Sequence, residues 1–388
     1  MKRLLSILTV LLLTGCVTRV DLRGTHDLGL VIERSSGSVS IVETTNQSRL
    51  GRIEGLGDLS HAHATYSRDG RYGYIFGRDG GLTKVDLLLR RIDRRIMQSG
   101  NAIGGSISQD GKLIVVQNYT PGGIKVFNAA TLAPISEVPA EYAPGLLSKV
   151  VGLADLPGQK FAYALFDAGE IWVTDLTDPA HPVTQRFKAG RQPYDAMVTP
   201  DGRYYIAGLF GEDALAMLDL WHPEKGVRKI LQGYGRGEEA LPVYKMPHLR
   251  GWAMVGQHLF LPAIGRHEVL VVDSTDWRET ARIPVRGQPV FVMGQPDGRR
   301  VWVNFAFPDN GLVQVIDTDS LAVVRTLAPG RGILHMEFTP RGESVWLSAR
   351  DDNRILVYDT RTLEQMRTLD IPNPSGIFLT NRSSRIGF

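Results

Sequence analysis

The sequence has almost no cysteine. Its 388 residues include one, Cys16, which excludes a disulfide bond within the chain. It also lacks an excess of charge of either sign: the formal net charge is +3, which gives no reason to expect nucleic-acid binding. It contains no glycine-rich phosphate loop, no His-Glu-x-x-His and no Gly-x-Ser-x-Gly. The sequence therefore carries no motif of the P-loop nucleotide-binding proteins, the zinc metalloproteases or the serine hydrolases that use them.

Long hydrophobic runs are also missing. The apolar run at residues 4–13 follows Lys2 and Arg3 and precedes Leu-Thr-Gly-Cys, which ends at Cys16. It is too short to span a bilayer and is typical of a cleaved signal peptide. Leu-Thr-Gly-Cys resembles a bacterial lipobox, so we expect residues 1–15 to be removed and Cys16 to be lipidated. A plain secretory signal is the alternative. We therefore predict a periplasmic protein on a membrane anchor, with residues 16–26 as its tether.

The most prominent feature of the sequence is a repeat. An Asp-Gly turn followed by a β-rich run recurs, as in DGRYGYIFGRDG at residues 69–80 and DGRYYIAGLF at residues 201–210. Each unit continues with a second strand that ends in an acid or an amide. Successive positions of this kind are 42 to 54 residues apart, at Glu43, Asp86, Asn128, Asp175, Asp219, Asp273, Asp317 and Asp359. This period is typical of the blades of a β-propeller.

We predict an all-β fold in which residues 27–388 form a single eight-bladed β-propeller. The segment SGIFLTN after EQMRTLDIP is expected to close the ring by pairing with the first blade. Seven blades are the alternative, because the unit around residues 231–250 is irregular. The repeated acids are assigned to turn capping, since Asp and Asn bond the backbone that follows them. Trp252, Trp302 and Trp346 are assigned to packing between blades.

The histidines are distributed unevenly over the repeats. In a propeller the innermost strand of each blade begins beside the axis, and here that strand precedes the Asp-Gly turn. Residues seven to nine before the turn glycine should therefore ring one mouth of the channel. They are His61, His63, Gly104, Tyr194, Asp195, His248, Phe291 and His335. Four of the nine histidines fall on this rim, and His61 and His63 would share one side of an extended chain.

Several kinds of ligand suit such a rim. A metal ion needs three or four close His or carboxylate groups, and a hydrolase needs a nucleophile paired with a base. A haem needs axial histidine, a flat apolar floor and cations for its carboxylates. Polar residues around a water-filled channel need no ligand at all. Arginines near strand ends and nearby aromatic rings favour a large, anionic, planar ligand; they are Arg34, Arg78, Arg191, Tyr119 and Phe307.

The segment GRYGYIFGRDGGLTKVDL resembles the d1 domain of cytochrome cd1 nitrite reductases, where a similar run follows the proximal haem-ligating histidine. ERSSGSVSIVE, NYTPGGIKVFNAATL, MPHLRG and GESVWLS resemble further stretches of that domain in the same order, over nearly the whole mature chain. The c-type haem domain of the reductases is missing, and no Cys-x-x-Cys-His is present. The chain is thus similar to a d1-like protein of haem d1 biosynthesis.

The resemblance implies a propeller that binds haem d1 or its iron-isobacteriochlorin precursor. By position, it implies an iron ligand at His61 or His63, carboxylate-binding cations at Arg34 and Arg78, and an aromatic contact at Tyr119. One distal histidine of the reductases matches His248, while Tyr194 and Asp195 stand where the other would be. Losing a distal histidine argues against nitrite reduction.

Three roles remain open. An enzyme would modify a side chain of the macrocycle, for example by dehydrogenating a propionate, with His248, Asp195 and Tyr194 handling protons. A carrier would deliver haem d1 or its precursor to cytochrome cd1 nitrite reductase or to another d1-domain maturation protein. A structural member of a maturation complex would need no ligand. Assembly into a homodimer is also left open.

Overall fold

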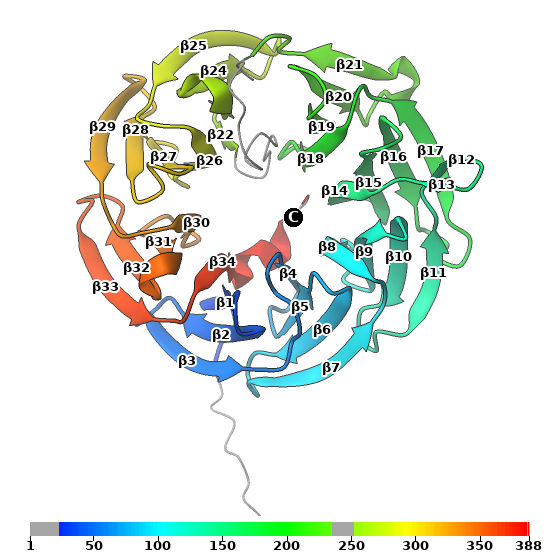
Figure 1. The fold of residues 1–388 in the computed structure, drawn as a ribbon, viewed down its shortest axis with the longest axis horizontal. Coiled ribbons are helices and arrows are strands. Elements are labelled where there is room, and N and C mark those ends of the chain that lie inside the picture. Colours follow the sequence, from blue (N-terminus) through cyan, green and yellow to red (C-terminus); the bar gives the residue numbers. More distant parts are fainter. Residues whose placement is uncertain (1–22, 235–251, 386, 388) are drawn as a thin grey trace, which may run out of the picture.

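The computed structural model describes residues 23–234, 252–385 and 387. In this part of the chain, eight four-stranded antiparallel sheets stand around a central axis like the blades of a propeller (Figure 1). Short 3-10 helices interrupt the strands: η1 (Pro223–Lys225), η4 (Ile264–Arg266), η5 (Arg350–Asp352) and η6 (Thr380–Ser384). Among the described residues, no helix has the length and apolar character needed to cross a membrane.

The first blade joins the two ends of the described chain. From the axis outward it consists of β34 (Pro374–Leu379), β1 (Leu28–Glu33), β2 (Ser38–Glu43) and β3 (Ser48–Ile53). β34 pairs antiparallel with β1, so that Phe378 stands opposite Leu30. The last strand therefore closes the ring on the first blade, as the sequence predicts.

Each of the other seven blades uses four consecutive strands, with the first nearest the axis (Figure 1). The second, third and fourth blades are β4–β7 (His63–Tyr66, Tyr72–Phe76, Gly81–Asp86, Arg91–Met97), β8–β11 (Asn101–Ile107, Leu113–Thr120, Gly123–Asn128, Pro134–Val138) and β14–β17 (Val150–Leu156, Lys160–Leu165, Glu170–Asp175, Val183–Lys188). A small hairpin, β12 (Glu141–Ala143) and β13 (Leu146–Leu147), lies between the third and fourth blades in the chain.

The second half of the ring continues without a gap in the pattern. Its blades are β18–β21 (Pro193–Val198, Tyr204–Leu209, Leu215–Asp219, Val227–Ile230), β22–β25 (Ala253–Val255, His258–Ala263, Glu268–Asp273, Arg278–Pro284), β26–β29 (Pro289–Gly294, Arg300–Phe305, Val313–Asp317, Ala322–Leu327) and β30–β33 (Ile333–Phe338, Ser344–Ala349, Arg354–Asp359, Gln365–Asp370). The ring has eight blades, so the seven-bladed alternative is wrong.

The core lies between neighbouring blades, where apolar side chains of one sheet meet those of the next. Trp302 and Trp346 are fully buried. Trp302 of β27 packs among residues of β30 and β31, and Trp346 of β31 packs against the first blade. Trp252 is also buried, in a cluster that the fifth and sixth blades share. The predicted packing of the tryptophans between blades is confirmed.

The repeated acids cap the turn after the third strand of each blade. Asp86 Oδ1 accepts the backbone N–H groups of Leu88 and Leu89 at 3.0 and 2.9 Å. Asn128 and Asp359 accept two backbone N–H groups in the same way. These side chains satisfy local backbone donors, which is the structural role that the sequence predicts for them.

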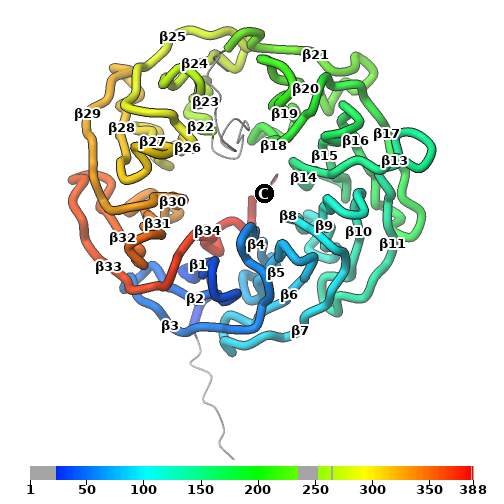
Figure 2. Tube along the Cα trace, viewed as in Figure 1, coloured from blue at the N-terminus to red at the C-terminus, as the bar shows by residue number. Residues whose placement is uncertain are grey.

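The two ends of the axis differ. We call the end at which the innermost strands begin the mouth, and the opposite end, at the Asp-Gly turns, the turn end. The C-terminal segment lies at the turn end: Arg68, in the turn after β4, donates to the Ser383 carbonyl, and the Gly387 N–H donates to Asp155 Oδ1 at 3.0 Å. The described C-terminal segment, which includes η6, thus lies close to the axis (Figure 2).

Candidate functional site

The innermost strands are bulged near the mouth, where the predicted rim residues stand. Strand pairing shifts between Pro193 and Ala196 in β18, between Pro289 and Val292 in β26, and between Ile333 and Met336 in β30. A bulge inserts a residue and redirects the local side chains, and bulges are frequent beside functional sites. The shifts enclose four rim residues, which are Tyr194, Asp195, Phe291 and His335.

The bulged amides are held by polar side chains that sequence reasoning missed. The His335 N–H donates to Ser348 Oγ, and the Phe291 N–H donates to Asn304 Oδ1, both at 2.9 Å. Ser348 and Asn304 are buried in otherwise apolar strands. A lone polar residue in such a strand, as in WLSA and WVNF, is the signal that indicates them, because a buried polar group needs a partner.

Aromatic rings from four blades meet at the mouth. The His63 ring lies 6.1 Å from that of Phe76, nearly parallel, and 5.3 Å from that of Phe378, edge to face. Phe378 also lies 5.7 Å from His335, which in turn is 6.1 Å from Phe291. We call these five residues the aromatic wall. The structure thus brings His63, Phe291 and His335 together, as predicted.

His61 does not share the environment of His63. β4 begins at His63, and His61 lies in an exposed bend before the strand. Because the segment is not a strand at His61, the alternation of a strand, on which the expectation that both imidazoles share one side rests, does not apply there. Gly104 adjoins His63: a Cβ built at Gly104 would lie 3.6 Å from that of His63.

A second group joins the second, third and fifth blades. The Arg78 guanidinium lies 5.7 Å from the centre of the Tyr119 ring, and the Tyr119 and Tyr194 hydroxyls are 2.5 Å apart. Burial raises the pKa of both phenols, and the nearby Asp195 carboxylate contributes in the same direction. Both phenols are therefore protonated at neutral pH and serve as hydrogen-bonding groups.

Arg34 and Arg78 share a carboxylate that the sequence did not single out. The Arg78 backbone N–H donates to the Asp58 carbonyl at 2.8 Å. Hydrogen bonds from Ser60 lower the pKa of the Asp58 carboxyl, and the charges of Arg78 and Arg34 lower it further. Both arginines are half-buried. The mouth therefore already has a carboxylate beside two cations.

Other predicted residues lie apart from these groups or cannot be placed. Arg191 is exposed, with its N–H donating to Glu212, and Phe307 is 75% exposed. His248 and Cys16 lie outside the described residues. Among the described residues, no group of three or more His, Cys, Asp or Glu side chains could hold a bare metal ion.

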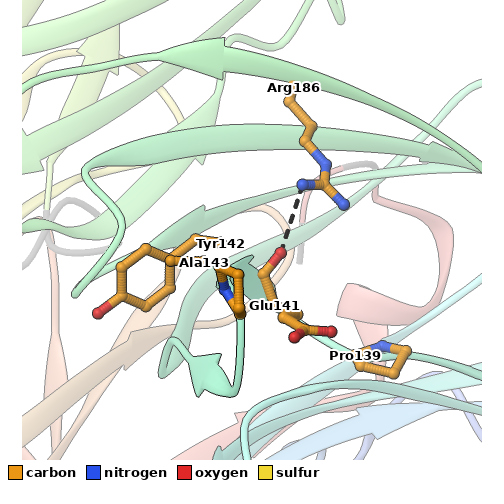
Figure 3. Close-up of a pocket in the computed structure, with 6 residues that line it drawn as sticks. Pro139, Glu141, Tyr142, Ala143 and Arg186 are labelled. Carbon is orange, nitrogen blue, oxygen red and sulfur yellow. Dashed lines mark hydrogen bonds between the residues drawn. The ribbon is translucent and has the colours of Figure 1, made fainter.

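A pocket of about 470 Å³ lies at the β12–β13 hairpin, lined by Pro139, Glu141, Tyr142, Ala143, Pro144 and Arg186 (Figure 3). Arg186 donates to the Glu141 carbonyl at 3.3 Å across it. The hairpin stands at the outer side of the ring (Figure 1). None of the predicted site residues lines this pocket, so it is separate from the mouth.

This chain is similar to known proteins over nearly its whole length. The Cytochrome D1 heme domain family matches residues 23–383. NirF of Pseudomonas aeruginosa is 56% identical over 388 residues, covering 99% of each chain, and NirF of Stutzerimonas stutzeri is 58% identical over 379 residues, covering 97% of each. The solved structure of dihydro-heme d1 dehydrogenase NirN in complex with DHE is 25% identical, with a TM-score of 0.82, over 94% of this chain and 78% of NirN. The chain therefore belongs to the cytochrome d1 haem domain family and, within it, to the NirF proteins.

Proposed function

We propose that this protein binds haem d1, or its iron-isobacteriochlorin precursor, at the mouth and acts in haem d1 biosynthesis for nitrite reductase maturation. One observation carries the proposal: the aromatic wall, two arginines and two candidate iron-binding histidines stand at one end of a d1-type propeller. The similarity to NirN, a dihydro-haem d1 dehydrogenase solved with DHE, supports the choice of ligand.

The residues at the mouth fit the chemistry of a tetrapyrrole. Such a ligand has apolar faces, carboxylates at its edge and an iron at its centre. The aromatic wall offers flat apolar surface for the faces, and Arg34 and Arg78 offer planar forks for carboxylates. The Asp58 carboxylate beside both arginines supports this pairing, because it has the same chemistry as the ligand's edge. His61 or His63 would provide an imidazole to the iron.

We further propose that the protein modifies a side chain of the bound tetrapyrrole. A late side-chain modification, such as dehydrogenation of a propionate, removes two protons and two electrons, so it needs a base for the first proton and an external acceptor for the two electrons and the second proton. Tyr119 and Tyr194 do not suit the role of base, because their raised pKa keeps them protonated at neutral pH. Asp195, beside Tyr194, is the described carboxylate that suits it, and His248 is the other candidate.

The alternative role is that of a non-catalytic carrier or scaffold that delivers haem d1 or its precursor to nitrite reductase. The phenol pair favours it, since two protonated hydroxyls 2.5 Å apart can orient a ligand without reacting with it. Asp195→Asn separates the two roles. In the enzyme it should spare ligand binding and block maturation of nitrite reductase in cells, whereas in the carrier it should leave maturation intact.

We propose further that a lipid on Cys16 anchors the protein to a periplasmic membrane surface. Thr25 donates to the Asp69 carbonyl in the turn after β4, so the described chain begins at the turn end. An anchor there supports a mouth that faces away from the membrane, towards soluble partners such as cytochrome cd1 nitrite reductase. Cys16→Ser should move the protein from the membrane fraction to the soluble fraction, and an unchanged distribution would refute the anchor.

An absorption titration tests the proposed function directly. Haem d1 extracted from a cytochrome cd1 nitrite reductase is added to the purified protein, and we expect saturable binding of one ligand per chain with the spectrum of a histidine-bound iron. The precursor is then incubated with the protein and a chemical electron acceptor. Conversion supports the enzyme, and binding without conversion supports the carrier. Absence of saturable binding of either ligand would overturn the proposal.

A further inference from the structure

His335 differs from the other mouth histidines in that one of its ring nitrogens is already in use. Its Nδ1 accepts the backbone N–H of Ile377, in β34, at 3.2 Å. A backbone N–H can only donate, so Nδ1 carries no proton. The single proton of a neutral imidazole must then be on Nε2.

The imidazole is neutral at physiological pH. Burial lowers the pKa of His335 to about 4, against a smaller opposing effect of Glu337, and Arg382 adds to the lowering. The ring packs against the rings of Phe291 and Phe378. His335 therefore has a defined state, in which Nδ1 accepts and Nε2 donates.

The Nε2–H group has no acceptor among the described residues 23–234, 252–385 and 387. Within the part of the chain that the structure describes, the His335 side chain makes its hydrogen bond through Nδ1 alone, and Nε2 is not among the buried polar atoms that lack a partner. The residue is half-buried. The His335 Nε2–H group is therefore an accessible hydrogen-bond donor at the mouth, and it belongs to a residue of the aromatic wall.

This state does not suit an iron ligand. A neutral imidazole coordinates iron through the nitrogen without a proton, and in His335 that nitrogen accepts the Ile377 N–H. Histidines that bind iron or zinc have the opposite arrangement, in which the second nitrogen donates to a protein acceptor. His335 has the arrangement of a hydrogen-bond donor to a ligand.

We infer that His335 is a further binding residue of the mouth, donating Nε2–H to a carboxylate or carbonyl oxygen of the bound tetrapyrrole, and that it does not ligate the iron. The inference rests on the proposed function. Phe378 lies between the His63 and His335 rings and contacts both. A macrocycle held at His63 would thus meet His335 towards its edge, where acceptor oxygens are found.

Two neighbouring elements fix the direction of the donor. Ser348 of β31 accepts the His335 backbone N–H at 2.9 Å, and Ile377 of β34 holds the ring through Nδ1. Ser348 is fully buried, so this hydrogen bond is shielded from water. The bulge and the closing strand together orient the imidazole before any ligand arrives, which reduces the entropy lost on binding.

The test compares His335→Phe, His335→Gln and the exposed control His258→Gln, with haem d1 as the probe. The phenylalanine removes the donor, and we expect affinity to fall roughly three- to tenfold, as for one neutral hydrogen bond. Glutamine retains an N–H donor and should recover most of the affinity. The control should match the wild type. In all three variants the absorption and electron paramagnetic resonance spectra of the ferric complex should remain those of the wild type.

The imidazole state is measured separately in the ligand-free protein. Nitrogen-15 NMR of histidine-labelled protein should show His335 protonated at Nε2 alone between pH 6 and 8, with the signal assigned by its loss in His335→Gln. A proton on Nδ1 would contradict the donor assignment.

Other outcomes overturn the inference in distinct ways. Wild-type affinity in His335→Phe would mean that the side chain does not contact the ligand. Loss of the histidine-bound spectrum in that variant, restored by added imidazole, would make His335 the iron ligand. If the wild type binds no haem d1, the proposed function fails and the donor role fails with it, while the NMR result on the ligand-free protein still stands.

Discussion

The two ends of the axis use the same residue types for different purposes. At the turn end Arg382 is 11% exposed and donates two hydrogen bonds to the Glu337 carboxylate, which is 4% exposed. Arg68 of the second blade donates to the Ile107 and Ser108 carbonyls of the third blade, and to the Ser383 carbonyl of the C-terminal segment. At the mouth Arg34 and Arg78 are half-buried beside a single carboxylate, Asp58.

This difference separates stability from binding. The arginines of the turn end are committed to groups of the protein itself, so they hold the C-terminal segment against the ring. The arginines of the mouth keep part of their hydrogen-bonding capacity for a ligand. Substitutions of the turn-end arginines should therefore lower stability, and substitutions of the mouth arginines should lower affinity at unchanged stability.

The largest effect is expected for Arg382→Ala. It leaves the Glu337 carboxylate buried without its partner, and breaking a buried ion pair in this way costs about 3–5 kcal/mol. Denaturant unfolding measures the loss. Arg331→Ala is the matched control, because it removes an arginine from an exposed ion pair and should leave stability unchanged. Equal stability of the two variants would show that the Arg382 pair does not hold the turn end.

A qualitative change is expected when the iron ligand is removed. Either His61→Ala or His63→Ala should abolish the histidine-bound spectrum of the haem d1 complex, and the other should be nearly silent. His63 is the half-buried member and His61 the exposed one, so the result also shows how deep the macrocycle lies. If both variants keep the wild-type spectrum, the ligand is neither residue.

Arg34→Ala and Arg78→Ala should each weaken haem d1 binding by roughly ten- to a hundredfold, because a charge-assisted hydrogen bond contributes about 1.5–3 kcal/mol. The midpoint of unfolding should not move. Lysine at either position should recover only part of the affinity, since the fork is lost. Arg186→Ala, at the outer pocket, should bind as the wild type does. Undiminished affinity in both mouth variants would assign these arginines to the fold.

The smallest expected effect is on the pH dependence of stability. The pKa of His335 is depressed to about 4 in the folded protein, whereas an unfolded chain binds the proton near pH 6.5. The contribution of His335 to the free energy of unfolding is fully present above about pH 6.5. It declines as the pH falls towards 4, because the unfolded state gains the proton first. We expect a difference on the order of 1 kcal/mol between wild type and His335→Gln across this window, after solvent screening. Parallel curves for the two proteins would contradict the shift.

Much of the ring was predictable from the sequence because its determinants are local. The Asp-Gly turns and the capping acids, such as Asp86 and Asp359, act on backbone groups a few residues away. Their regular spacing gave the number of blades, and the strand-like segment after Asp370 gave the closure on β1.

The mouth was predictable only in part. The offset from the turn glycine correctly predicts that His63, Phe291 and His335 lie at one end of the ring. It does not predict the bulges at Phe291 and His335, because a bulge depends on how two strands pair. Asp58 belongs to no repeat, and only its position beside Arg34 and Arg78 reveals it. Glu337 and Arg382 are 45 residues apart in the chain, so no local pattern joins them.

The central claim is that the ligand binds at the mouth, and a crystal structure of the protein with haem d1 tests it most directly. We predict the macrocycle at the starts of the innermost strands, with its carboxylates at Arg34 and Arg78 and an acceptor oxygen at His335. A macrocycle bound instead at the turn end or in the pocket beside Arg186 would contradict the account.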